Sequence, residues 1–235
     1  MSRTYLFAGV LVAGLLSSSI ALAHVSISSG PATADQSQKI TLGVGHGCEI
    51  GGEHYDTAKV RVDIPTGFTG VRALFSDFGK PTLIRDGSTV TAVEWAKPAA
   101  DILDGDDGYY DLTFRARTPN APFSQVVFTV HQTCIVNGEE VTVVWTGTGA
   151  ENPGPVLTLI PARTNPKGWN KLTIPTGVTV PADKMGTYFA DALIVWRGTE
   201  AFSTNANTAA LIASTPGVTA LTGDLAAGDV IWVRY

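Results

Sequence analysis

Short segments that alternate polar and apolar residues recur from Ser37 to Gly147, and this alternation constrains the fold more than any other feature. Lys59–Ile64 and Tyr110–Arg117 alternate without interruption, which predicts strands with one buried and one wet face. Repeated strands with regular turns predict an all-β fold, an immunoglobulin-like or cupredoxin-like sandwich of two sheets. Further strands are expected at Lys39–Val44, Val71–Leu74, Thr89–Trp95, Phe123–Cys134 and Glu139–Trp145.

Residues 1–23 have the pattern of a secretory signal peptide. Arg3 precedes an apolar run from Leu6 to Leu16, and Ala21-Leu22-Ala23 has the small-x-small pattern that signal peptidase cuts. Cleavage between Ala23 and His24 would place the mature protein in the periplasm or outside the cell. The apolar run is too short to span a bilayer, so we expect no membrane anchor. A net charge of −5 argues against a nucleic-acid partner.

The character of the sequence changes near residue 149. Residues 149–167 are rich in Pro, Gly and Asn, which predicts a linker that follows a sandwich domain of residues 24–148. Residues 168–235 combine strand-like segments with a short helix and predict a small C-terminal α+β extension, whose role the sequence does not indicate. The strands are expected at Leu172–Ile174, Ala192–Trp196 and Val230–Tyr235, and the helix at Asn205–Ala213.

The chain has two cysteines, Cys48 and Cys134. In an exported protein such a pair predicts one disulfide, because the compartment is oxidising. The alternative is a thiolate metal site, which would need both thiols to stay reduced. A disulfide closing this loop would stabilise the fold by roughly 4–5 kcal/mol in the chain-entropy model.

Asn137-Gly138 is a strong signal for a two-residue hairpin turn. The turn pairs Cys134 with Val141 and Val130 with Trp145, so Cys134, Gln132 and Trp145 share one face while His131 points to the other. A disulfide to Cys48 would tie Gly45-His46-Gly47-Cys48-Glu49 beside this hairpin. Glu49 is therefore a candidate carboxylate near Trp145.

Cleavage after Ala23 would give His24 a free α-amino group next to its own imidazole. The amine nitrogen and Nδ1 can close a six-membered chelate ring, which suits the tetragonal nitrogen and oxygen coordination of Cu(II). Together with the Glu49 carboxylate this makes a reasonable Cu(II) site. All its ligands must be deprotonated, so we expect affinity to fall as the pH drops.

Several of these segments, in this order, resemble the YcnI-like bacterial copper-binding proteins, over roughly residues 24–147. The resemblance implies an immunoglobulin-like fold and a monohistidine brace, in which a terminal histidine and a carboxylate bind Cu(II) beside a tryptophan. In this chain that implies His24, Glu49 and Trp145. It also implies a copper donor or chaperone whose partner is a membrane copper-import protein. The matching segments are His24-Val25, Gly45-His46-Gly47-Cys48-Glu49, Val60-Arg61-Val62-Asp63-Ile64-Pro65, Gln132-Thr133-Cys134 and Trp145-Thr146-Gly147.

The remaining histidines have different expectations. His46 is a candidate second imidazole ligand, but in an extended strand it shares a face with Cys48 rather than Glu49, so it can join Glu49 only if Gly47 breaks the strand. His54 is expected in an exposed loop and His131 as a hydrogen-bonded strand residue. Met185 is the only methionine after the leader, which leaves no thioether-rich Cu(I) site.

The leading hypothesis is a non-catalytic Cu(II)-binding protein that buffers copper or delivers it to a membrane importer. One alternative is a histidine-brace copper oxidase or monooxygenase, which would normally show a second ligating histidine and a flat aromatic binding surface. Another is a structural immunoglobulin-like interaction module in which His24 has no role. Stoichiometric Cu(II) binding would exclude the last, and reductant-driven turnover of a polysaccharide would separate the first two.

Overall fold

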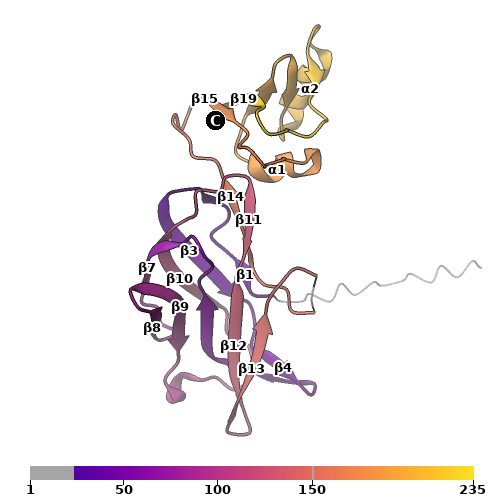
Figure 1. Ribbon diagram of the computed structural model, residues 1–235. Helices are drawn as coiled ribbons and strands as arrows, with labels where there is room; N and C mark the ends of the chain where they lie inside the picture. Colours follow the sequence, from indigo (N-terminus) through magenta and orange to yellow (C-terminus); the bar gives the residue numbers. More distant parts are fainter. Residues whose placement is uncertain (1–23, 150) are drawn as a thin grey trace, which may run out of the picture.

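A computed structural model describes residues 24–149 and 151–235; the predicted signal peptide and its cleavage site involve residues outside these ranges. The chain is mostly β and forms a sandwich of two antiparallel sheets with a smaller unit beyond one end (Figure 1). The first sheet has the order β13-β12-β6-β9-β8. Its strands are β13 (Glu139–Trp145), β12 (Thr129–Val136), β6 (Thr57–Asp63), β9 (Thr89–Ala96) and β8 (Lys80–Asp86).

The second sheet has the order β1-β3-β10-β7, and its inner face packs on the first. Buried side chains recur at every second position, as in Ile40 and Leu42 of the second sheet and Val60 and Val62 of the first, and they form one core. This is the sandwich that the alternating pattern predicts. The strands are β1 (Ser26–Ile27), β3 (Ser37–Val44), β10 (Tyr110–Arg117) and β7 (Thr69–Ala73).

Two smaller groups of strands complete the sandwich. One is a three-stranded sheet with the order β11-β14-β2, and the other is the ribbon β4-β5. The ribbon follows β3 directly, and Cys48 at its start is joined to Cys134 of β12 by the predicted disulfide. The strands are β11 (Ser124–Val127), β14 (Val156–Ile160), β2 (Ala32–Thr33), β4 (Cys48–Ile50) and β5 (Glu53–Tyr55).

Two sequence predictions are wrong in this region. The segment Phe123–Cys134 is not one strand: it divides at Phe128 into β11 and β12, which belong to different sheets. Phe128 is fully buried and its ring contacts Phe68 and Phe114, so the apolar run continues through the corner where the chain changes sheets. The predicted linker 149–167 contains β14, whose backbone pairs with β11 and β2.

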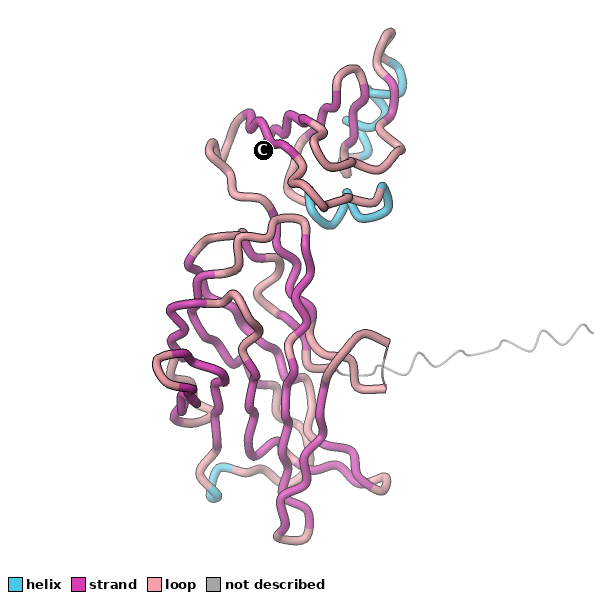
Figure 2. The backbone as a smooth tube through the Cα atoms, viewed as in Figure 1, coloured by secondary structure: helices cyan, strands magenta, loops and turns pink. Residues whose placement is uncertain are grey.

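The C-terminal unit has its own sheet, with the order β15-β19-β16-β17-β18, and its own core. Figure 2 shows that the helices gather here, apart from the 3-10 turn Ala99–Asp101 in the sandwich. The Asn205 side chain caps α2 by accepting from the backbone N–H groups of Asn207 and Thr208. The elements are β15 (Trp169–Thr173), the 3-10 turn Ala182–Lys184, α1 (Met185–Tyr188), β16 (Ile194–Arg197), β17 (Glu200–Phe202), α2 (Ala206–Ser214), β18 (Thr219–Ala220) and β19 (Val230–Arg234).

Phe123 joins the two units. It lies just before β11, yet its ring belongs to the C-terminal core. The centroid of the Phe123 ring lies 5.6 Å from that of the Tyr188 ring and 5.7 Å from that of the Phe189 ring. In the described part of the chain, no helix is both long and apolar enough to cross a membrane.

Candidate metal centre

Two histidines from different segments meet at one tryptophan. The ring centroid of His24 lies 5.7 Å from that of Trp145, and the ring centroid of His46 lies 6.3 Å from it, both edge-on. The pairing of β1 with β3 explains the meeting: Ser26 lies opposite Gly43, so the same antiparallel register continued outward brings His24 next to Gly45 and hence to His46. Trp145 ends β13 on the inner face that the hairpin turn predicts.

The strand does break at His46, as its role as a candidate ligand requires. Backbone pairing stops at Val44 and resumes at Cys48, with a bend at His46 between them. Gly47 makes the bend possible, because a Cβ there would collide with the carbonyl oxygen of Tyr55. The half-buried His46 ring lies beside Trp145 at this break in the strand.

Gln132 is a positioning residue that the sequence argument placed on the correct face without giving it a role. Its side chain is 1% exposed. Its Oε1 accepts from the indole Nε1–H of Trp145 at 2.9 Å, and its Nε2 donates to the backbone carbonyl of His46 and to the Thr57 hydroxyl, both at 2.7 Å. One amide thus holds both the indole and the His46 bend. The signal was a polar residue on an inward-facing strand position, because such a residue must find partners.

Glu49, the residue after the disulfide-bonded Cys48, lies near the same site. Together with His46, Trp145, Glu151 and Asn152 it lines a cavity of about 340 Å³. The Glu49 side chain is exposed and lies opposite His54 in the β4–β5 ribbon. The predicted proximity of Glu49 to Trp145 is therefore present, with Glu151 as a second carboxylate that the sequence argument missed.

The other two histidines lie outside this group. His54 is exposed as expected, but it belongs to β5 rather than to a loop, and its Nδ1 lies 2.9 Å from Asp106. His131 lies on the opposite face of β12, where its Nε2 is 3.0 Å from Asp63, which confirms the expected hydrogen-bonded strand histidine.

Side chains alone do not make a complete metal cage here. Within residues 24–149 and 151–235, no three His, Cys, Asp or Glu side chains gather closely enough to hold a metal ion. The donors beside Trp145 are the imidazoles of His24 and His46, with Glu49 at the cavity wall. A third nitrogen at this position would come from the α-amino group of a chain that begins at His24, and this set suits Cu(II).

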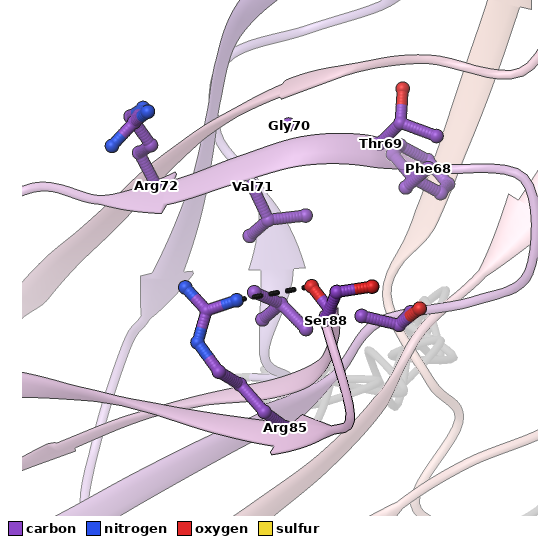
Figure 3. Close-up of a pocket in the computed structure, with 9 residues that line it drawn as sticks. Phe68, Thr69, Gly70, Val71, Arg72, Arg85 and Ser88 are labelled. Carbon is purple, nitrogen blue, oxygen red and sulfur yellow. Dashed lines mark hydrogen bonds between the residues drawn. The ribbon is translucent and has the colours of Figure 1, made fainter.

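Two other cavities have different chemistry. One lies between β7 and the β8–β9 turn and has a volume of about 320 Å³; among the described residues, no His, Cys or carboxylate lines it. Figure 3 shows the residues around it, with Arg85 donating to the Ser88 carbonyl. The other, about 820 Å³, has Asp56 and Lys97 in its wall. These two form a buried ion pair, and the Tyr110 hydroxyl donates to Asp56 at 2.7 Å. Burial and Asp56 raise the pKa of Tyr110. The side chains of Asp56, Lys97 and Tyr110 hydrogen-bond to one another, so this cluster is internally paired.

Comparison with known proteins adds little to these observations. No protein-family model matches the chain, and no curated protein matches it. Among solved structures, the chain is similar to an uncharacterized protein from Nocardia farcinica that is described as having an immunoglobulin-like fold. The two are 22% identical with a TM-score of 0.46, and the match covers 58% of this chain and 97% of the other.

Proposed function

We propose that the mature protein is an exported, non-catalytic Cu(II) carrier that holds copper at its N-terminus and delivers it to a membrane copper-import protein. The observation that carries this proposal is the approach of two imidazoles, His24 and His46, to the single indole of Trp145. Histidine is the commonest metal ligand among side chains. Two of the four histidines of the chain meet at the position where signal-peptide cleavage would supply an amine.

The His24 amine and Nδ1 form the chelate, and the His46 imidazole provides a third nitrogen. The Glu49 carboxylate is the candidate oxygen ligand, because it lines the same cavity as His46. In the described structure it does not yet gather with the two imidazoles, so it would have to move toward them when Cu(II) binds. A site with several nitrogen donors and one oxygen donor favours Cu(II), whereas Mg²⁺ and Ca²⁺ prefer oxygen donors alone. The lack of a methionine-rich cluster favours Cu(II) over Cu(I) as the bound state.

The surroundings of the donors support a site that is held in place. Gln132 fixes the backbone of His46 and the indole of Trp145 together, and the disulfide ties Glu49 to the same hairpin. Groups that orient metal ligands in this way commonly change metal affinity by about 10–100-fold when they are removed. Gln132 therefore acts through His46 and Trp145 rather than as a ligand.

A second candidate function is an oxidative copper enzyme of the histidine-brace type. The specific observation in its favour is the second imidazole, since His46 stands beside Trp145 as His24 does. Oxygen uptake by the copper-loaded protein in the presence of ascorbate, with release of oxidised sugars from a polysaccharide, would support this enzyme and contradict a carrier. A copper-loaded protein that consumes no more oxygen than free Cu(II) supports the carrier.

The decisive experiment compares two forms of the protein, one beginning at His24 and one with a Gly-Ser-Gly-Ser extension ahead of it. We expect one Cu(II) per chain for the first form in titration calorimetry. We expect at least about a hundredfold weaker binding for the extended form, roughly 3 kcal/mol, because the amine leaves the site while every side chain stays. Equal affinity for the two forms would contradict the proposal.

Single substitutions then assign the remaining donors. His46→Gln and Glu49→Gln should each weaken Cu(II) binding and change the paramagnetic resonance spectrum of the bound ion. His131→Gln is the matched control, because its ring lies on the opposite face of β12 and pairs with Asp63. A spectrum that is identical with and without Glu49 would exclude that carboxylate as a ligand.

A further inference from the structure

Three tryptophans line the outward face of the C-terminal sheet. Trp169, Trp196 and Trp232 surround, with Gly198, a shallow hollow of about 500 Å³. Trp169 is 44% exposed and Trp232 is 46% exposed. Exposed aromatic side chains that gather in one place generally mark a binding surface, because water contact with so much apolar area is unfavourable.

Strand register places the three indoles on one face. Trp232 of β19 lies directly opposite Trp196 of β16 on one side and Lys171 of β15 on the other, and Trp169 lies opposite Arg234. Directly paired residues project from the same side of a sheet. The alternate residues of β19, Ile231 and Val233, are buried in the C-terminal core, so the tryptophans project away from that core.

The same outward face is covered where no tryptophan stands. Ala201 of β17 lies opposite Trp196 and is only 1% exposed, and helix α2 packs against β17 and β18. The β15, β19 and β16 part of the face keeps its large rings in solvent. Helix α2 therefore covers the β17 and β18 part of this face, whereas the part that carries the tryptophans stays exposed to solvent.

Two cations stand among the rings. Lys171 faces Trp232 across the strand pair, and the Arg234 guanidinium lies 5.9 Å from the centre of the Trp169 ring. Neither forms an ion pair within the part of the chain that the structure describes. Arg197 of the same sheet is different, because Glu200 and Asp229 neutralise it. In a chain of net charge −5, two unneutralised cations beside exposed indoles favour an anionic ligand.

We propose that this face, the tryptophan face (Trp169, Trp196, Trp232, Lys171 and Arg234), binds an acidic polysaccharide whose sugars bear carboxylates. The C–H groups of a sugar ring carry partial positive charge and stack on the negative face of an indole. Lys171 and Arg234 then pair with the carboxylates between the stacked sugars. The hollow is within the size range of small-molecule sites, and a flat strand surface accepts an extended polymer. This proposal does not depend on copper binding.

The test uses the full chain and alginate, a polymer of uronic acids, with dextran as the neutral polysaccharide. We expect retarded migration in native gels that contain alginate, no retardation in dextran gels, and quenching of tryptophan fluorescence on titration. Trp232→Ala and Trp169→Ala should each weaken alginate binding about tenfold, the loss of one stacked ring. The Lys171→Gln/Arg234→Gln variant, which keeps every ring, should weaken binding and reduce its dependence on salt.

Leu211→Ala is the matched control, since Leu211 is 65% exposed on α2, away from the hollow. It should bind alginate as the unmodified chain does. Absence of retardation in alginate, or equal retardation in dextran, would overturn the proposal. Two further results would overturn it: the chain sediments with phosphatidylglycerol vesicles, or it dimerises, and in either case Trp232→Ala abolishes that interaction but leaves alginate binding unchanged.

Discussion

The two parts of the molecule use tryptophan in opposite ways. In the sandwich, Trp95 is fully buried and Trp145 is 6% exposed, whereas Trp169 and Trp232 of the C-terminal sheet are nearly half exposed. All four lie on strands, so strand propensity does not explain the difference. A second sheet faces Trp95 and Trp145, and nothing in the described structure faces Trp169 and Trp232. The environment of a residue thus follows from which side of its sheet has a second layer.

The two parts also differ in the interactions that stabilise them besides their hydrophobic cores. The sandwich has the Cys48–Cys134 disulfide and the buried Asp56–Lys97 pair. The C-terminal unit has no cysteine, and its ion pairs, such as that of Arg197 with Asp229, lie nearer the surface. We therefore expect removal of the disulfide or of the buried ion pair to destabilise the sandwich more than the C-terminal unit.

The largest effect is expected from Cys48→Ala/Cys134→Ala. Removing a link between residues 86 apart in sequence should destabilise the sandwich by about 4–5 kcal/mol in the chain-entropy model. Hydrogen exchange followed by mass spectrometry should show faster exchange mainly in β4, β6, β12 and β13. An equal increase in β15, β16 and β19 would mean that the two parts unfold as one unit.

Phe123→Ala should affect the other part. The Phe123 ring fills the C-terminal core although its backbone precedes β11 of the sandwich. Its loss leaves a cavity against Tyr188 and Phe189, at a cost of about 3–4 kcal/mol. Urea denaturation should detect an earlier transition that hydrogen exchange assigns to β15, β16 and β19. Phe75→Ala, at a side chain that is 80% exposed in the sandwich, is the control and should change neither transition.

The hairpin shows how much of this fold can be predicted from the sequence. Asn137 and Gly138 both adopt positive φ, 54° and 86°, which is the backbone that a two-residue turn of this kind needs. The turn therefore determined the pairing of Cys134 with Val141 and of Val130 with Trp145. Local chemistry was sufficient there, because two residues set the register of two whole strands.

The errors have a different physical origin. Phe128 is apolar like its neighbours, so alternation could not reveal that the chain changes sheets at this residue. Strand β14 lies in a segment rich in proline and glycine, and it forms because β11 and β2 offer backbone partners on both sides. At the candidate metal centre, the disulfide predicted that Glu49 lies near Trp145. The approach of His46 to Trp145 accompanies a break in the strand at which Gly47 packs against the Tyr55 carbonyl, and this long-range contact has no signal in the local sequence.

Lys97→Met tests whether the buried ion pair of Lys97 with Asp56 stabilises the sandwich. The side chain of Lys97 is 4% exposed and that of Asp56 is 1% exposed, so the substitution leaves a buried carboxylate without its cation. We expect a loss of about 3 kcal/mol in urea denaturation. Lys59→Met is the matched control: its partner Glu140 is 58% exposed, and the loss should stay within about 1 kcal/mol. Similar losses for both variants would contradict the role assigned to burial.

The smallest effect is expected at Asp229 in the C-terminal unit. The backbone N–H of Ala226 donates to its carboxylate at 2.9 Å, Arg197 donates at 3.0 Å, and both lower the pKa of Asp229. A lowered pKa stabilises the fold above the ordinary pKa of about 3.9, and this contribution disappears as the pH falls through the lower folded value. Asp229→Asn should cost about 1 kcal/mol at neutral pH.

The deficit of Asp229→Asn in urea denaturation should narrow as the pH drops below about 4, because protonation then removes the same charge from the unmodified protein. Asp183→Asn is the control, since Asp183 is 73% exposed and pairs with the neighbouring Lys184. A deficit that persists unchanged in acid would mean that the Asn side chain disturbs the Gly228-Asp229 turn itself. The C-terminal unit would then depend on turn geometry rather than on charge, which would sharpen its contrast with the covalently linked sandwich.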